Sequence, residues 1–227
     1  MKIIASDFDD TLYIKDDISK TKDNIDSIKK FITNGNIFII ITWRSYSNIK
    51  VVLKELNIPY SYLICEDGAK IFNNMDYCID TTYMKEEDIN KIIPLIEKED
   101  YYLDDGYNET NNINDTVKVV VNCSDKSKSN ELINTINKYV DTYIYASNEH
   151  INIVDKSINK QKGLEKLFYI ENLDFNNLYV IGDNDNDLEM LKEYNGAIIT
   201  DHSKSLDILE KPTYETLKDF IDDIIKN

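Results

Sequence analysis

Short apolar runs alternate with amphipathic segments over the first third of the chain. The runs at residues 3–5, 37–41 and 62–65 are short and mostly β-branched or otherwise apolar, which is typical of buried parallel strands. Between them, residues 19–34 and 45–56 repeat apolar side chains at spacings of three and four, which predicts amphipathic helices. This order predicts a right-handed, doubly wound parallel sheet of the α/β class.

The pattern changes after the third run. Residues 70–80 predict a short hairpin. Helices are then expected at 85–99 and 126–139, and strands at 100–103, 116–121, 142–146 and 151–154. The polar stretch 104–112 predicts a solvated turn rather than a calcium loop, because the alternating ligand spacing is missing. Together these segments predict a small α/β unit, an open-faced sheet with helices on one side.

From residue 159 the first pattern returns. A helix is expected to open at Lys160-Gln161-Lys162-Gly163, followed by a strand at 178–181, a helix near 188–191 and a strand at 197–199. Helical segments near 203–209 and 214–225 end the chain. We therefore predict a Rossmann-like core formed by residues 1–80 and 156–227, with residues 81–155 as an inserted small α/β domain.

Composition narrows the function classes. The 227 residues carry a formal net charge of −16, with 42 acidic against 26 basic side chains, which argues against nucleic acid as a partner. No apolar stretch reaches membrane-spanning length, and no signal peptide is expected because acidic residues interrupt the N-terminal apolar run. Three cysteines without paired spacing predict reduced thiols and a cytoplasmic location, and two separated histidines argue against a zinc site.

Polar residues cluster where the predicted strands end. Asp7 and Asp9 follow the first strand, Thr42 and Arg44 follow the second, and a run from Asp183 to Asp187 follows the strand at 178–181. Carboxylates gathered at the carboxyl edge of a sheet need a compensating charge, and a hard divalent cation would supply it. If the first strand stays extended through Phe8, Asp7 and Asp9 lie on the same side.

Each feature also has an ordinary structural explanation. The aspartates could form an acidic loop, Thr42 a turn, Lys162 a solvated helix start, and the run from Asp183 an Asx-type cap. Arg44 could form a salt bridge at a helix start rather than bind substrate. The full set, in this order at strand ends, favours a shared site.

With these residues in place, the chain resembles the haloacid dehalogenase (HAD) superfamily, and within it the Cof-like subclass IIB of sugar-phosphatase relatives. Asp7-Phe8-Asp9-Asp10-Thr11 matches the motif D-x-D-x-T, and Thr42-Trp43-Arg44 resembles T-G-R. Lys162-Gly163 is assigned to the third motif, and Gly182 to Asp187 matches G-D-x-x-N-D. The resemblance covers essentially the whole chain and places the insert where this subclass carries its cap.

The resemblance implies a Mg²⁺-dependent phosphatase acting on a small-molecule phosphate ester, expected to be a sugar phosphate. Asp7 would be the nucleophile and Asp9 the general acid and base. Thr42, Lys162, Asn186 and Arg44 would serve phosphate or substrate binding. The implied metal ligands are the carboxylates of Asp7 and Asp183, the backbone carbonyl of Asp9, and Asp187 directly or through water.

Three departures from the family pattern stand out: Trp43 replaces the usual Gly, Asp10 replaces a common Gly, and the insert is small for the Cof-like group. Trp43 could narrow the site, stack on substrate, or serve packing. A phosphomutase or phosphotransferase would share all four motifs. A non-catalytic binding module that keeps the fold is a further alternative. The sequence leaves the particular ester and the oligomeric state open.

Overall fold

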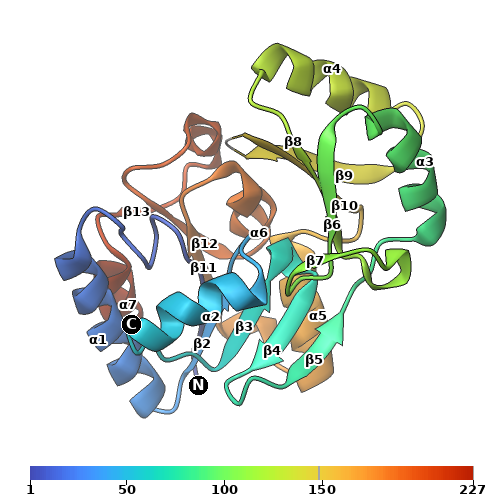
Figure 1. Cartoon of the computed structure of the whole chain (residues 1–227). Coiled ribbons are helices and arrows are strands. Elements are labelled where there is room, and N and C mark those ends of the chain that lie inside the picture. The colour runs from blue at the N-terminus through green and yellow to red at the C-terminus, as the bar shows by residue number, and fades with distance from the viewer. Residues whose placement is uncertain (148, 227) are drawn as a thin grey trace.

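The computed structural model describes residues 1–147 and 149–226, and its strands form two separate sheets (Figure 1). The larger has eight strands in the order β13-β12-β11-β1-β2-β3-β4-β5, and the smaller has five in the order β7-β6-β8-β10-β9. The strands of the larger sheet are β1 (Ile3–Asp7), β2 (Ile37–Ile41), β3 (Tyr62–Cys65), β4 (Lys70–Asn73), β5 (Cys78–Thr81), β11 (Leu178–Gly182), β12 (Asn195–Ile199) and β13 (Thr213–Tyr214).

Helices cover both faces of the larger sheet. They are α1 (Ile18–Thr33), α2 (Tyr46–Glu55), α5 (Lys160–Glu171), α6 (Leu188–Glu193) and α7 (Leu217–Lys226), with 3₁₀ turns η1 (Glu66–Gly68), η3 (Phe175–Asn177), η4 (Asp185–Asp187) and η5 (Lys204–Leu209). Because strand side chains alternate, Ile4 and Ile40 pack in one core with α1, α2 and α7, whereas Ile3 and Ile39 pack in another with α5 and α6. The doubly wound α/β fold predicted from the sequence is confirmed.

The central strand β1 runs parallel to both of its neighbours. Ile3 pairs with Leu178 of β11 on one side and with Ile37 of β2 on the other. Its five residues are all buried, as the β-branched run predicted. Residues that follow β1, β2 and β11 therefore meet at one edge of the sheet. The predicted hairpin is formed by β4 and β5. β4 extends the sheet antiparallel to β3, and β5 runs antiparallel to β4 at the edge.

The smaller sheet is antiparallel throughout and carries two helices on its outer side (Figure 1). Its elements are α3 (Glu86–Ile96), β6 (Asp100–Asp104), β7 (Glu109–Thr110), η2 (Ile113–Asp115), β8 (Lys118–Asn122), α4 (Lys126–Ile136), β9 (Thr142–Ser147) and β10 (His150–Asp155). Its own core joins residues such as Ile92, Val119 and Ile153. The two-residue strand β7 was not predicted, because it lies within the polar stretch interpreted as a turn.

The chain passes between the sheets twice, after Thr81 and after Asp155. These crossings lie close to the predicted boundaries at residues 80–81 and 155–156. The assignment of the two parts as catalytic core and substrate-selecting cap stays a prediction. In the described part of the chain, no helix combines the length and apolar character that crossing a membrane requires.

Candidate active site

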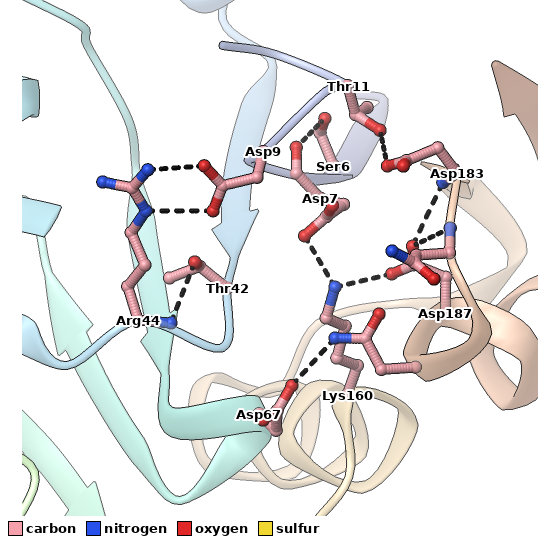
Figure 2. Close-up of polar contacts among 12 residues, drawn as sticks. Ser6, Asp7, Asp9, Thr11, Thr42, Arg44, Asp67, Lys160, Asp183 and Asp187 are labelled. Carbon is pink, nitrogen blue, oxygen red and sulfur yellow. Dashed lines mark hydrogen bonds and ion pairs between the residues drawn. The ribbon is translucent and has the colours of Figure 1, made fainter. Parts of the chain in front are cut away.

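Three buried carboxylates meet at the carboxyl ends of the neighbouring strands β1 and β11. One oxygen each from Asp7, Asp183 and Asp187 lies within 4.8 Å of the others (Figure 2). Burial raises the pKa of Asp7 well above its usual value, and burial together with the charge of Asp187 raises the pKa of Asp183 to about 6. Carboxylates this close destabilise one another, so the site requires positive charge.

Lys160 supplies part of that charge from the first residue of α5. Its Nζ lies 2.6 Å from Asp7 Oδ1 and 2.7 Å from Asp187 Oδ1, and its side chain is 1% exposed (Figure 2). Burial alone would lower its pKa, but the charges of Asp187 and Asp7 outweigh burial and raise it. Lys160 is therefore held as a cation between two carboxylates.

The structure does not bring Lys162, the lysine assigned to the third motif, to this position. Lys162 Nζ donates instead to the backbone carbonyl of Lys156, 2.8 Å away at the protein surface. The helical period explains the difference, because Lys160 shares a buried face with Leu164 and Leu167 at spacings of four and seven. Lys162, two residues further on, lies off that face. The spacing relative to the apolar residues was the signal that identifies Lys160.

Gly163, the other residue assigned to the third motif, has a packing role. A Cβ at Gly163 would lie 2.6 Å from the Cα of Gly68, which adopts a φ of +118° in η1. The two glycines therefore let the start of α5 approach the turn after β3. This contact sets the position of the helix that carries Lys160.

Asp9 forms a two-point ion pair with Arg44, the residue that follows β2 by three positions. Arg44 Nε and Nη2 donate to the two carboxylate oxygens of Asp9 at 2.9 and 2.5 Å (Figure 2). The guanidinium also lies 5.2 Å from the centre of the Phe8 ring. Since β1 ends at Asp7, strand periodicity does not extend to Asp9. Of the two roles considered for Arg44, the structure therefore contains the salt bridge.

Thr42 is fully buried at the end of β2. Its backbone N–H donates to the Ile64 carbonyl, and its hydroxyl oxygen accepts from the Arg44 N–H at 3.1 Å. Its carbonyl accepts from the N–H of Asp67, which ties it to the turn after β3. These contacts fix Thr42 at the same sheet edge as Asp7.

Asp187 also organises the loop after β11. Its Oδ2 accepts from the backbone N–H groups of Asp183 and Asn184, each at 3.1 Å, in a capping arrangement at η4. The Asx-type cap, which was the ordinary structural explanation for the run from Asp183, is therefore present as well. A Cβ at Gly182 would lie 2.4 Å from Asp187 Cγ, so only glycine leaves room for this carboxylate.

Two further residues, for which the sequence pattern predicted no role, enter the site. Thr11, the last residue of the first motif, donates from Oγ1 to Asp183 Oδ1 at 2.7 Å. Asp67 of η1 accepts from Asn186 Nδ2 at 3.1 Å and from the hydroxyl of Tyr145. The position of Thr11 in D-x-D-x-T was an available signal. No sequence signal identified Asp67, because its partners lie far away in the chain.

A cavity of about 540 Å³ lies over these groups between the two sheets. It is lined by Asp7, Asp9, Asp10, Trp43, Tyr143, Tyr145, Ala146, Asp183, Asn184, Asp185 and Asn186. The tyrosines and Ala146 belong to β9 of the smaller sheet. Trp43 is 39% exposed and faces this space, so it does not serve core packing. The site therefore has room for a small molecule between the strand ends and β9.

The fold and site define a class: a doubly wound α/β protein with an acidic, lysine-bearing site at the strand ends and a second α/β unit over it. The family model for haloacid dehalogenase-like hydrolases matches residues 4–104 and 101–199. The chain belongs to this family of hydrolases, and the superfamily resemblance of its motifs is confirmed.

Individual relatives agree with this assignment. A protein of Buchnera aphidicola subsp. Baizongia pistaciae (strain Bp), named as a candidate phosphatase, is 25% identical over 236 residues, covering 90% of this chain and 88% of its own. A HAD/Cof-like hydrolase candidate from Plasmodium vivax has the same fold, with a TM-score of 0.83 at 18% identity, covering 100% of this chain and 96% of that one. A HAD phosphatase from Bacteroides thetaiotaomicron also gives a TM-score of 0.83, at 16% identity over 100% and 94% of the chains.

Proposed function

We propose that the protein is a Mg²⁺-dependent phosphatase that hydrolyses a small phosphorylated metabolite, a sugar phosphate, through an aspartyl-phosphate on Asp7. The observation that carries the proposal is the position of Lys160, a buried cation 2.6 Å from Asp7 at the carboxyl edge of the sheet. A phosphate dianion approaches a carboxylate nucleophile only where positive charge screens both, and Lys160 provides such charge at the reacting oxygen. Membership of a hydrolase family supports the same reaction.

The carboxylate cluster fits a hard divalent cation. Asp7, Asp183 and Asp187 each offer an oxygen within 4.8 Å of the other two, and oxygen donors are what Mg²⁺ binds. Burial and the charge of Asp187 raise the pKa of Asp183, and a cation bound beside it would favour its ionised form. When bound, Mg²⁺ would neutralise charge on the phosphoryl oxygens. The backbone carbonyl of Asp9 remains a proposed further ligand.

Asp7 and Asp9 would divide the chemistry. Asp7 would attack phosphorus, forming the bond to its carboxylate oxygen while the bond from phosphorus to the alcohol oxygen breaks. Protonated Asp9 would give its proton to that oxygen. As a carboxylate it would later take a proton from a water whose oxygen bonds to phosphorus while the bond from phosphorus to Asp7 breaks, which frees phosphate and Asp7. Arg44 donates to both carboxylate oxygens of Asp9 and would thereby orient this side chain for both proton transfers.

The remaining groups would position the reactants. Thr42 at the end of β2 would bind phosphoryl oxygens together with Lys160, which takes the role first assigned to Lys162. Asn186 would act by holding Asp67, since its amide already donates there. The smaller sheet would act as the cap, because Tyr143 and Tyr145 of β9 lie over the cavity and would shield it from water.

The test is phosphate release from p-nitrophenyl phosphate and a panel of sugar phosphates. Each would be measured with Mg²⁺, with EDTA, and with the Asp7→Asn variant as the matched control. Turnover that requires both Mg²⁺ and Asp7 is expected, and the panel then ranks substrates. Absence of turnover from folded protein on every ester would contradict the proposal and favour a binding module. Phosphate transfer that depends on an added hydroxyl acceptor would favour a mutase or phosphotransferase.

A further inference from the structure

Among the residues that the structure describes, the walls of the cavity carry negative charge and no positive charge. Five carboxylates line it, whereas none of its described lining residues is a lysine or an arginine. Lys160 and Arg44 lie beneath or beside it, but each is already paired, with Asp7 and Asp187 or with Asp9. A substrate that fills the cavity therefore finds cationic groups only at its reacting phosphate.

Two of the carboxylates lie outside the group proposed to react or to bind metal. Asp10 is exposed in the turn after β1, and it forms no ion pair with any described residue. Asp185 accepts hydrogen bonds from the hydroxyls of Ser203, at 2.5 Å, and Ser205, which fix its carboxylate at the cavity wall without neutralising it. A substrate group that reaches this wall would thus meet two negative charges in addition to those of the reacting centre.

The rest of the wall is aromatic and uncharged. Trp43 comes from the loop after β2, and Tyr143 and Tyr145 come from β9. Their faces offer apolar area and their polar atoms offer hydrogen bonds, but no counter-charge for an anion. Aromatic rings and carboxylates together accept neutral or cationic groups and disfavour anionic ones.

We propose that this cavity selects phosphate monoesters whose alcohol part carries no second anionic group, so that bisphosphates and phosphorylated carboxylic acids are poor substrates. The inference rests on the proposed phosphatase function and specifies its substrate class. The physical basis is repulsion: a second anion placed among Asp10 and Asp185 gains no partner and meets like charge in a partly enclosed space.

Matched ester pairs test the proposal. Fructose 6-phosphate against fructose 1,6-bisphosphate, and open-chain sorbitol 6-phosphate against 6-phosphogluconate, differ chiefly in the second anion. We expect kcat/KM to favour the first member of each pair by at least about tenfold, with p-nitrophenyl phosphate as the reference substrate. The preference should shrink in about 1 M NaCl, where the Debye length is about 3 Å, whereas a preference due to shape alone would persist.

Charge-removing variants identify the residues responsible. The double variant Asp10→Asn with Asp185→Asn should lower the preference for singly anionic esters several-fold. Asparagine is suitable at position 10 because it tolerates the left-handed backbone of Asp10, which has a φ of 58°. The control is Asp26→Asn with Asp222→Asn, which removes the same charge from α1 and α7, where each aspartate pairs with a helix lysine. An unchanged preference in the cavity variant, or an equal change in the control, would overturn the proposal.

The failure of this inference is distinguishable from failure of the proposed function. If p-nitrophenyl phosphate is hydrolysed in an Asp7-dependent reaction but both members of each pair are used equally, the function stands and the selectivity is wrong. If no ester is hydrolysed at all, the function itself fails. Competitive inhibition by fructose 1,6-bisphosphate as strong as by fructose 6-phosphate would also contradict the inference.

Discussion

Lys118 of β8 in the smaller sheet forms a buried ion pair with Glu66, the residue that directly follows β3 of the larger sheet. The two side chains are 7% and 0% exposed. Glu66 Oε1 has no hydrogen-bond partner among the described residues, so the pair satisfies only one of the two carboxylate oxygens. With the hydrogen bond from Tyr145 to Asp67, this pair is a polar link between the two sheets.

Removing the lysine from this pair should destabilise the protein strongly. Lys118→Met keeps the length of the side chain but leaves the Glu66 carboxylate buried without its counter-charge. We expect the free energy of unfolding at about pH 8 to fall by about 3–5 kcal/mol in urea titrations. The double variant with Glu66→Gln should recover most of this loss. Lys29→Met, at an exposed pair with Asp26, is the control and should change stability little. A loss equal to that of the control would contradict the argument.

The pH dependence of stability should carry the signature of Glu66. Burial raises its pKa from 4.5 to about 7, despite the opposing charge of Lys118. Between those values the folded state binds more protons than the unfolded state, so the Glu66 contribution to stability falls as pH rises from about 4.5 to about 7 and is constant above. The difference in unfolding free energy between wild type and Glu66→Gln should follow this curve, with a total change of about 3 kcal/mol. If the difference in unfolding free energy instead rises with pH, the pKa of Glu66 is not raised in the folded protein.

Lys160 and Lys162 should differ sharply in their effect on activity. Lys160→Met removes the cation that contacts Asp7 and Asp187, and we expect kcat for p-nitrophenyl phosphate to fall by about 10²–10³. Lys162→Met removes only a surface contact with the Lys156 carbonyl and should leave kcat within about twofold of wild type. Circular dichroism melting would verify that both variants fold. Equal losses in the two variants would show that the buried position of Lys160 does not decide its role.

The sequence predicted most of the fold because its signals are local. Apolar runs and helical spacing located β2 and β3 at the residues observed, and α1 within one residue of its ends. The pattern predicted a helix from residue 19, but the N-cap of α1 is Asp17, whose carboxylate accepts from the Ser19 and Lys20 N–H groups. A cap can shift along a polar segment at little cost, which is why its position was less certain than the helix.

The site was less predictable where it depends on contacts distant in sequence. Motif spacing brought Asp7, Asp183 and Asp187 together correctly. The link from Asp67 to Asn186 and Tyr145 joins three separate elements, and no local pattern encodes it. The choice between Lys160 and Lys162 depended on which face of α5 is buried, which the motif alone does not state.

Binding of Mg²⁺ should stabilise the folded protein through the carboxylate cluster. Asp7, Asp183 and Asp187 repel one another at the distances observed, and a bound cation removes that repulsion only in the folded state. We expect Mg²⁺ to raise the melting temperature of wild type, EDTA to reverse the shift, and Asp183→Asn to reduce it. Asp174→Asn, in the loop before β11, is the matched control and should keep the full shift. An equal shift in Asp183→Asn and wild type would place the cation elsewhere.

Trp43 should act on substrate binding rather than on stability. Its side chain is 39% exposed and lines the cavity, so its loss opens no core void, and Trp43→Ala should change the unfolding free energy by less than about 1 kcal/mol. The loss of its exposed aromatic face from the wall should raise KM for sugar phosphates several-fold and affect kcat less. Trp43→Phe, which keeps a flat ring, should restore most of the affinity. If Trp43→Gly instead raises turnover several-fold at unchanged KM, the indole obstructs the site, and its replacement of the usual glycine weakens catalysis.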